Sequence, residues 1–500
     1  MILDPNTVSR ELRLRADVCV VGSGAGGAVV ARELAEAGLH VVVFEEGRYN
    51  TSRDFDQREV EMYPRLYREQ ASPATADFSV LVLQGRTLGG STVPSFCIAA
   101  RPPAAILDAW QQTGLAGAGS AVMAPYFERV EKALEVKLTL DAEVNANNAR
   151  FRTGAEALGL RCKPVWHSRV ECVGCGYCSL GCAYDRKNDA LTRYLPAASR
   201  AGALLVPQCA VQMIEVKNGR AVAVGGNLWR EDGRRIPMRV SARAVVLAAG
   251  AVGSPRLWLR NRLPDTNRNV GRHLHLHPQV VVQALFEQRI EGWNGVPQCF
   301  VVDQYVRDEP SGGGFWLAPS FAHPVTAAAL APGFGDEHRR WMERYDRLAM
   351  TTVFLHDRSE GRVDIDTEGR AVVDYHLIDD DRADLLEGMQ RAAELLLAAG
   401  AVEVALPFTE RTVLTDVRQP LPAHGVRASD PFLVSYQPHG TLRMGKDART
   451  SVVDPTGEAH EVKGLYVADA SLFPTALAAP PQLSVMAFAT RVAEKVRATI

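Results

Sequence analysis

A glycine-rich segment near the start of this chain has the residue types and the spacing of a phosphate-binding turn. Gly22, Gly24 and Gly27 follow a short apolar segment at residues 17–21 and precede an alanine-rich stretch, residues 28–37, that favours a helix. Glycine allows the backbone to approach a pyrophosphate, and the amino end of a helix offers free N–H groups and a positive dipole end. The segment therefore predicts a dinucleotide site between a strand and a helix.

A carboxylate follows this turn at the place where a ribose would be bound. A second apolar segment, residues 41–45, comes after the predicted helix and ends in Glu45. An acidic residue at this place in a strand–turn–helix–strand unit accepts hydrogen bonds from the ribose of a dinucleotide. A glycine-rich turn in an unrelated α/β domain is the alternative, but the flanking strand and helix patterns favour the dinucleotide site.

Four cysteines form the second group of residues whose spacing predicts chemistry. Cys172, Cys175, Cys178 and Cys182 have the spacing of ferredoxin ligands, although Ala183 stands where such a run normally has proline. Glycines between them permit the tight turns that would direct the thiolates at one cluster. The run predicts an iron–sulfur cluster, and it leaves a zinc ion, free thiols or a disulfide open as alternatives.

The overall composition limits the classes of function. The chain has 500 residues, of which 47% are hydrophobic and 23% are charged, as in ordinary globular proteins, so we expect two or more domains. Its net charge of -2 provides no positive field for nucleic acid. No apolar run approaches the length needed to span a membrane, and the amino terminus lacks the regions of a secretory signal. We therefore expect a cytoplasmic protein with neither nucleic-acid binding nor a membrane span.

Hydrophobic periodicity predicts further helices and strands along the chain. Residues 107–158 have a helical pattern, and apolar residues recur at helical spacing over residues 381–399. A strand, a proline-rich turn and a final helix are expected within residues 464–500. The other expected strands lie at 204–216, 222–229 and 244–250, with several more between 279 and 366.

Six motifs spread along the chain resemble those of one flavoenzyme family, and they occur in that family's order. They are GRTLGGST at 85–92, AAGAVGSPR at 248–256, NVGR at 269–272, GTLRMG at 440–445, SVVD at 451–454 and LYVADASLFPT at 465–475. Together with the first glycine turn, they resemble the glucose–methanol–choline (GMC) oxidoreductase family. Because the motifs cover nearly the whole chain, the resemblance is specific.

The resemblance implies that the dinucleotide is FAD, and it assigns residues to parts of the cofactor. Glu45 would contact the adenosine ribose, Val211 would lie near the adenine, and Asp469 would lie beside the ribityl chain. Gly90 and Ser91 would lie near the pyrophosphate and the isoalloxazine ring. The other residues expected at the cofactor are Ala25, Arg86, Ala249 and Gln482, together with the three glycines of the first turn.

The resemblance also implies an α/β fold that combines a Rossmann-like FAD-binding domain with an α+β substrate domain built on an antiparallel sheet. The FAD-binding domain is expected to be discontinuous and to consist of residues 1–105, 196–278 and 428–500. Residues 106–195 would form a helical and cysteine-rich insertion, and residues 279–427 the substrate-binding domain. We expect the substrate cavity at the junction between the antiparallel sheet and the flavin.

The sequence departs from the family at the positions expected around the flavin ring. Gln437 occupies the position of the family's catalytic histidine, and Pro480 and Ser95 replace the other two polar groups expected there. An amide does not titrate at neutral pH, so Gln437 can hold a substrate oxygen but cannot act as a base. His439 and His277 are therefore candidates for the base. The other histidines considered for this role are His273, His275 and His356.

These observations predict an FAD-dependent oxidoreductase that takes a hydride from the CH–OH group of a small-molecule alcohol to flavin N5. Oxygen or a redox protein would then accept the electrons. One alternative is a different reaction on the same fold, namely dehydrogenation of a C–C or C–N bond or a lyase reaction. The other is a non-catalytic electron-transfer protein in which the flavin and the cysteine cluster form a relay.

Overall fold

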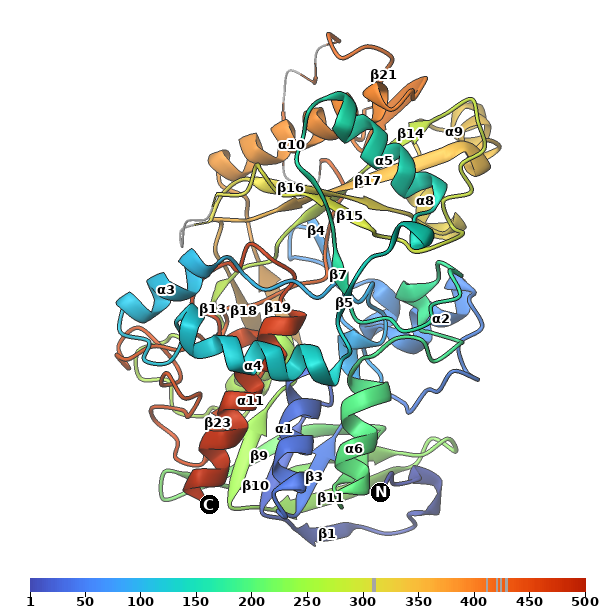
Figure 1. Ribbon diagram of the computed structural model, residues 1–500. Helices are drawn as coiled ribbons and strands as arrows, with labels where there is room; N and C mark the ends of the chain where they lie inside the picture. Colours follow the sequence, from blue (N-terminus) through green and yellow to red (C-terminus); the bar gives the residue numbers. More distant parts are fainter. Residues whose placement is uncertain (308–311, 411, 420, 423–424, 428–429) are drawn as a thin grey trace.

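A five-stranded parallel sheet forms the centre of the lower half of the molecule in the computed structural model (Figure 1). The model describes residues 1–307, 312–410, 412–419, 421–422, 425–427 and 430–500. The strand order is β23-β12-β2-β3-β8, with every neighbouring pair parallel. The bounds are Val18–Val21 for β2, Val41–Phe44 for β3, Leu204–Val206 for β8, Ala244–Leu247 for β12 and Leu465–Val467 for β23.

Helix α1 (Ala25–Glu36) connects β2 to β3, as the alternation of apolar segments and glycines predicts. The residues of β2, β3 and β12 are buried throughout, which is typical of parallel strands covered on both faces. Helix α11 (Gln482–Thr499) packs against α1, so the two ends of the chain meet on this sheet (Figure 1). The predicted Rossmann-like arrangement is confirmed.

A second, four-stranded sheet in the order β1-β11-β10-β9 lies beside the parallel sheet. The predicted strand at 204–216 is two strands that belong to different sheets, because β8 joins the parallel sheet and β9 joins this one. The bounds are Leu12–Arg15 for β1, Cys209–Lys217 for β9, Arg220–Trp229 for β10 and Arg235–Ser241 for β11.

A nine-stranded and mostly antiparallel sheet forms the upper half of the molecule (Figure 1). Its main order is β21-β20-β14-β17-β16-β15-β6, and β22 pairs with both β14 and β4. The bounds are Val80–Val82 for β4, Cys162–Pro164 for β6, Gln279–Leu285 for β14, Phe300–Val302 for β15, Phe315–Ser320 for β16, Leu348–Leu355 for β17, Glu403–Leu406 for β20, Thr412–Leu414 for β21 and Leu433–Ser435 for β22.

Helices α5 (Ala146–Ala157) and α10 (Asp379–Ala398) cover one face of this large sheet (Figure 1). The predicted helix at 381–399 is thus confirmed, with two further residues at its start. Leu385, Met389 and Leu395 of α10 are fully buried, and the acidic first turn suits the positive end of the helix dipole.

The predicted helical region 107–158 contains three helices, α3 (Ala104–Gln112), α4 (Ser120–Ala133) and α5, with the short strand β5 (Lys137–Leu138) among them. None of the helices in the described ranges combines the length and apolar character that a membrane span requires. Further helices and strands are α2 (Glu59–Leu66), α6 (Leu195–Arg200), α7 (Gly250–Arg260), α8 (Pro324–Leu330), α9 (Asp336–Met342), β7 (Trp166–His167), β13 (Arg272–Leu274), β18 (Gly361–Ile365) and β19 (Ala371–Asp374).

The membership of the large sheet differs from the predicted division of the chain. Strands β4, β6 and β22 belong to it, although they lie outside residues 279–427. Residues 279–366 also include helices α8 and α9, which the strand-like pattern did not indicate. The predicted division into three domains stays a prediction. The two halves of the molecule have separate hydrophobic cores, and the cavity described below has walls from both.

Candidate functional site

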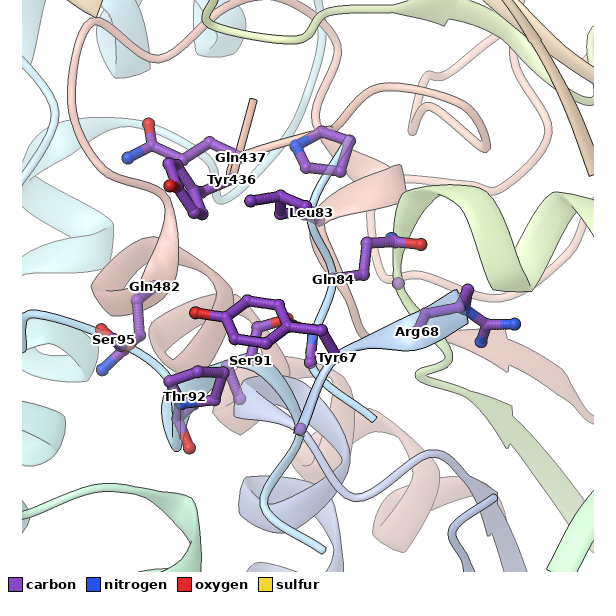
Figure 2. Close-up of a pocket in the computed structure, with 18 of the residues that line it drawn as sticks. Tyr67, Arg68, Leu83, Gln84, Ser91, Thr92, Ser95, Tyr436, Gln437 and Gln482 are labelled. Carbon is purple, nitrogen blue, oxygen red and sulfur yellow. Dashed lines mark hydrogen bonds between the residues drawn. The ribbon is translucent and has the colours of Figure 1, made fainter. Parts of the chain in front are cut away.

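A cavity of about 380 Å³ extends from the carboxyl ends of the parallel strands to the large antiparallel sheet. Its wall includes Val21 and Glu45 on the first side and Val281, Trp316 and Phe354 on the second. Such junctions between sheets are the usual place for ligand sites. The close-up of this cavity shows polar side chains facing it from several segments (Figure 2).

The first glycine turn forms the part of the wall where the amino end of α1 begins. Gly22, Gly24 and Ala25 line the cavity. Gly22 has a φ of 102°, a conformation that favours glycine, and Gly24 is the N-cap of α1 without any side-chain cap. The N–H groups of the first helical turn have no partner within a helix, so they are donors for a negatively charged ligand.

Two neighbouring glycines have a packing role. Gly27 does not line the cavity, and a Cβ atom on it would lie 1.9 Å from the Gly22 oxygen. A Cβ on Gly26 would lie 1.5 Å from the Ala468 oxygen, beside β23. Both positions therefore allow α1 to begin directly against the ends of the parallel strands.

Glu45 follows β3 and lies buried in the cavity wall, as the sequence pattern predicts. Its carboxylate accepts hydrogen bonds from the Ser23 hydroxyl at 2.7 Å, from the Ser23 N–H at 3.2 Å and from the Gly47 N–H at 2.8 Å. Burial raises the pKa of Glu45 to about 7, although these hydrogen bonds act in the opposite direction. Val211 lines the same cavity.

Asp469 is a second buried carboxylate in the wall. It accepts hydrogen bonds from the Gly250 N–H at 2.9 Å, from the Ser254 hydroxyl at 2.5 Å and from the Ser471 N–H at 2.9 Å. Burial raises its pKa, against the effect of these donors. The carboxylate therefore joins the start of α7 to the segment after β23, and Ala249 lies beside it in the wall.

The other predicted cofactor residues divide into two groups. Gly90, Ser91 and Gln482 line the cavity, and Gln482 accepts a hydrogen bond from the Ser95 hydroxyl at 3.3 Å. Arg86 is not part of the wall: its side chain is half exposed and lies 3.6 Å from the Glu46 carboxylate. The wall fits FAD, because a free helix terminus can bind phosphates and buried carboxylates can accept hydrogen bonds from hydroxyl groups.

Gln437 lines the cavity, and so do Pro480 and Ser95. Figure 2 shows Gln437 facing the cavity from one side, with Gln482 and Ser95 on another. The Gln437 Oε1 atom lies 3.1 Å from Nδ1 of His277. This contact orients the amide and leaves its nitrogen as the group that can bond a ligand.

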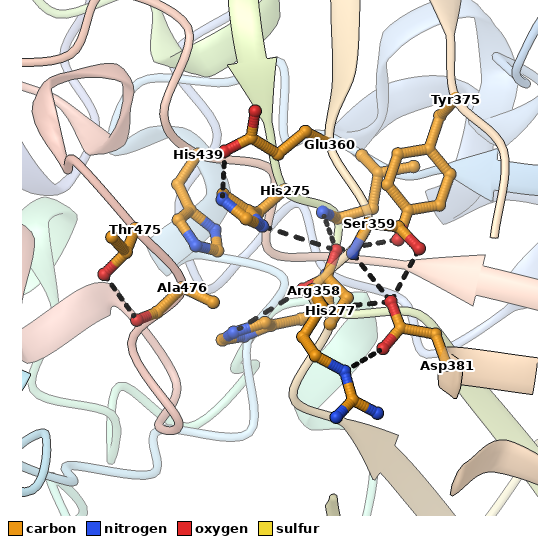
Figure 3. Close-up of polar contacts among 12 residues, drawn as sticks. His275, His277, Arg358, Ser359, Glu360, Tyr375, Asp381, His439, Thr475 and Ala476 are labelled. Carbon is orange, nitrogen blue, oxygen red and sulfur yellow. Dashed lines mark hydrogen bonds and ion pairs between the residues drawn. The ribbon is translucent and has the colours of Figure 1, made fainter. Parts of the chain in front are cut away.

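The structure places the predicted bases His439 and His277 behind this wall. Neither lines the cavity, and His439 is fully buried, with its ring centroid 4.7 Å from that of His277 and 5.3 Å from that of His275. Figure 3 shows these three rings gathered together. Burial lowers the pKa of both His439 and His277. Because neither ring belongs to the cavity wall, a catalytic role for either histidine stays a prediction, and His277 contacts the wall through Gln437.

The segment that contains His273, His275 and His277 is not a regular strand. Strand β13 ends at Leu274, and His273 and His277 have φ values of 61° and 46°. His273 pairs with Glu360 at 2.7 Å, and the same carboxylate lies 3.9 Å from Nε2 of His275. The buried Asp357 carboxylate holds this irregular segment, since it accepts hydrogen bonds from the N–H groups of Leu276 and His277 and from the Tyr375 hydroxyl.

His323 is a cavity residue that sequence reasoning missed. Among the residues that the structure describes, it is the only histidine in the wall. Its ring is stacked on Tyr177 with centroids 4.2 Å apart, and its buried Nδ1 atom has no hydrogen-bond partner. Burial lowers its pKa, while Glu59 acts in the opposite direction. It follows β16 and precedes α8, where the His-Pro pair gives no sequence signal for a site.

Apolar side chains form most of the wall on the side of the large sheet. Because they carry no charge, this part of the cavity suits the apolar body of a ligand. They are Leu83, Val281, Trp316, Phe321, Leu330, Phe354, Phe432 and Val434.

The four clustered cysteines line a second, small cavity. All nine cysteines of the chain are free thiols, so the disulfide alternative is wrong. Within the described ranges, no three His, Cys, Asp or Glu side chains are arranged to hold a metal ion, so the structure gives no support to the zinc alternative. Ligation of an iron–sulfur cluster by Cys172, Cys175, Cys178 and Cys182 stays a prediction.

Two alanine substitutions test the assignment of the glycine turn. A Cβ on Gly24 meets only the Gly90 Cα atom, at 3.8 Å, so we expect Gly24→Ala to change apoprotein stability by less than about 0.5 kcal/mol. Its methyl group would occupy the phosphate position and weaken FAD binding about tenfold or more. Gly26→Ala, the matched variant, should destabilise the fold by about 1–3 kcal/mol. Thermal unfolding and FAD titration measure both effects, and unchanged FAD affinity in Gly24→Ala would contradict the assignment.

Comparison with known proteins agrees with this geometry. Models described as GMC oxidoreductase match residues 62–279 and 357–489, and a model of an NAD(P)-binding Rossmann-like domain matches residues 20–79. A structure of formate oxidase from Aspergillus oryzae has a TM-score of 0.76 at 16% identity and covers 98% of this chain and 99% of its own, which shows a common fold.

The sequence alignments with two relatives cover nearly all of the chain. The long-chain-alcohol oxidase FAO4A of Arabidopsis thaliana is 29% identical over 96% of this chain and 68% of its own length. An uncharacterised GMC-type oxidoreductase of Mycobacterium tuberculosis is 35% identical over 97% of this chain and 76% of its own length. The chain therefore belongs to the GMC oxidoreductase family, and it is an oxidoreductase whose cofactor is FAD.

Proposed function

We propose that this oxidoreductase removes a hydride from the CH–OH carbon of an alcohol with a long apolar body. The observation that carries the proposal is that one cavity has the FAD-type wall on one side and an uncharged, aromatic-rich wall on the other. An apolar chain buried against the second wall would hold its terminal alcohol toward the first. The similarity to a long-chain-alcohol oxidase supports this substrate class.

The protein groups near the alcohol would bind and orient it. FAD supplies the acceptor for the hydride when it is bound. The Gln437 amide nitrogen would donate a hydrogen bond to the alcohol oxygen, and the contact between Gln437 and His277 would keep the amide in that orientation. Pro480 adds no donor at the position next to it. His277 is thus a positioning residue in this proposal.

His323 is the group we assign to accept the hydroxyl proton. Its lowered pKa keeps the ring neutral at neutral pH, and a neutral imidazole can accept a proton. Its position in the wall gives it access to the cavity that His439 lacks. Oxygen or a redox protein would accept the electrons from the reduced enzyme.

A series of primary alcohols from ethanol to dodecanol tests the substrate class. The FAD-loaded protein is mixed with each alcohol without oxygen, and loss of the visible flavin band is followed by stopped flow. Each methylene buried against the apolar wall should raise kcat/KM by up to about fourfold, because burial of a CH₂ contributes about 0.8 kcal/mol. If amines or saturated C–C substrates reduce the flavin and no alcohol does, the fold carries another dehydrogenation. If only a reduced carrier protein does so, the chain is an electron-transfer protein.

Substitution of His323 tests the proton acceptor. We expect His323→Gln to slow flavin reduction by alcohol at least about a hundredfold, while the exposed His376→Ala, as the control, leaves the rate unchanged. Because burial lowers the pKa of His323, the wild-type rate should be constant above pH 6.5 and fall only at lower pH. The rate of His323→Gln should not show this decrease at low pH. A variant that folds normally and keeps both the rate and the pH profile would show that His323 is not the base.

A further inference from the structure

The four clustered cysteines lie around one small cavity next to the FAD cavity. Cys172, Cys175, Cys178 and Cys182 all belong to its wall. The backbone between them needs glycine, since Gly176 has a φ of 83° and a Cβ on it would lie 1.9 Å from the Trp293 oxygen. The loop therefore folds so that all four thiols surround a common space.

A buried cation without a partner lines the same cavity. Arg169 is 1% exposed, and among the described residues none of its three guanidinium nitrogens has a hydrogen-bond partner. The Glu143 carboxylate, which lies in this region, accepts a hydrogen bond from the Leu140 N–H at 2.9 Å and pairs with His167 Nε2 at 3.4 Å instead. A buried charge that is neither paired nor hydrogen-bonded is strongly unfavourable. The Arg169 charge acts on the Glu143 carboxylate without a hydrogen bond between them, so the cavity favours a further anion beside the guanidinium.

A second buried cation in the wall has only neutral oxygen partners. Lys187 is 1% exposed, and its ammonium group donates to the carbonyl oxygens of Ser95 at 2.9 Å and Cys178 at 3.0 Å, and also to that of Val93. The nearby Asp189 carboxylate accepts hydrogen bonds from Thr192. Two buried cations, Arg169 and Lys187, therefore line the cavity together with the four thiols.

We propose that Cys172, Cys175, Cys178 and Cys182 bind an iron–sulfur cluster whose negative charge compensates Arg169. On binding, each thiol releases its proton to water and forms one Fe–S bond, and a supply of ferrous and ferric iron in equal amounts with sulfide builds the core without a further oxidant or reductant. A four-iron core with four thiolates carries net negative charge, which would compensate the buried guanidinium of Arg169. The iron and sulfide atoms occupy the centre, so the thiols need not approach one another as closely as the ligands of one ion.

The cluster would lie against the wall of the FAD cavity. Ser179, between the third and fourth cysteines, lines the FAD cavity, and its carbonyl accepts a hydrogen bond from the Tyr67 hydroxyl at 2.9 Å. Lys187 links Cys178 to Ser95, which also lines the FAD cavity. The two redox sites would therefore share a wall of a few residues.

Metal analysis of the full-length protein, purified without oxygen, tests this site directly. We expect about four iron and four acid-labile sulfide atoms per chain, and an electron paramagnetic resonance signal after reduction with dithionite. Cys172→Ser and Cys178→Ser should lose the iron while keeping FAD. Cys162→Ser, a cysteine on β6 outside the small cavity, is the matched control and should keep it. FAD-loaded wild-type protein without iron and sulfide, or with zinc in their place, would overturn the proposal.

Substitution of Arg169 tests the charge argument with a separate readout. A nearby cation stabilises the more negative, reduced form of a cluster, so Arg169→Gln should lower the midpoint potential. The midpoint potential of Arg169→Lys, which keeps the positive charge, should lie closer to that of the wild type. An unchanged potential in Arg169→Gln would contradict the role of Arg169. If this variant does not fold, the iron content of the cysteine variants still decides whether the site binds a cluster.

Discussion

The close approach of backbone segments at the start of α1 is the constraint on which the site depends. A Cβ on Gly22 would lie 2.2 Å from the Ala248 oxygen, and one on Gly26 would lie 1.5 Å from the Ala468 oxygen. The amino end of α1 is therefore in contact with the ends of β12 and β23. This contact directs the free N–H groups of the helix into the cavity, where they can bind phosphate.

Two buried carboxylates complete the cofactor side of the cavity because the same contact positions them. Glu45 accepts a hydrogen bond from the Ser23 N–H within the turn, and Asp469 lies two residues after the end of β23. The opposite wall has no carboxylate or cationic side chain from the large sheet, and its polar members include the amide of Gln437, the hydroxyl of Thr352 and the ring of His323. The cavity thus combines strong anchoring for FAD with an environment that favours apolar substrates.

The sequence alone predicted those elements of the fold whose residue pattern lies within one short segment of the chain. The apolar runs at 17–21 and 41–45, together with the glycines and Glu45, were sufficient to predict the strand–turn–helix–strand unit. Each element of this unit depends mainly on the types of its own residues. Strands β4 and β22 could not be assigned to the large sheet, since their pairing joins segments more than 350 residues apart. His439 and His323 illustrate the same limit, because burial behind Gln437 or exposure in the wall depends on tertiary packing.

The most direct test of the account is a comparison of FAD and FMN binding to the apoprotein by equilibrium titration. FMN has the isoalloxazine ring but lacks the pyrophosphate and adenosine that the turn and Glu45 are assigned to bind. The account predicts one FAD per chain, bound at least about a hundredfold more tightly than FMN. Equal affinity for the two flavins, or no uptake of either, would contradict it.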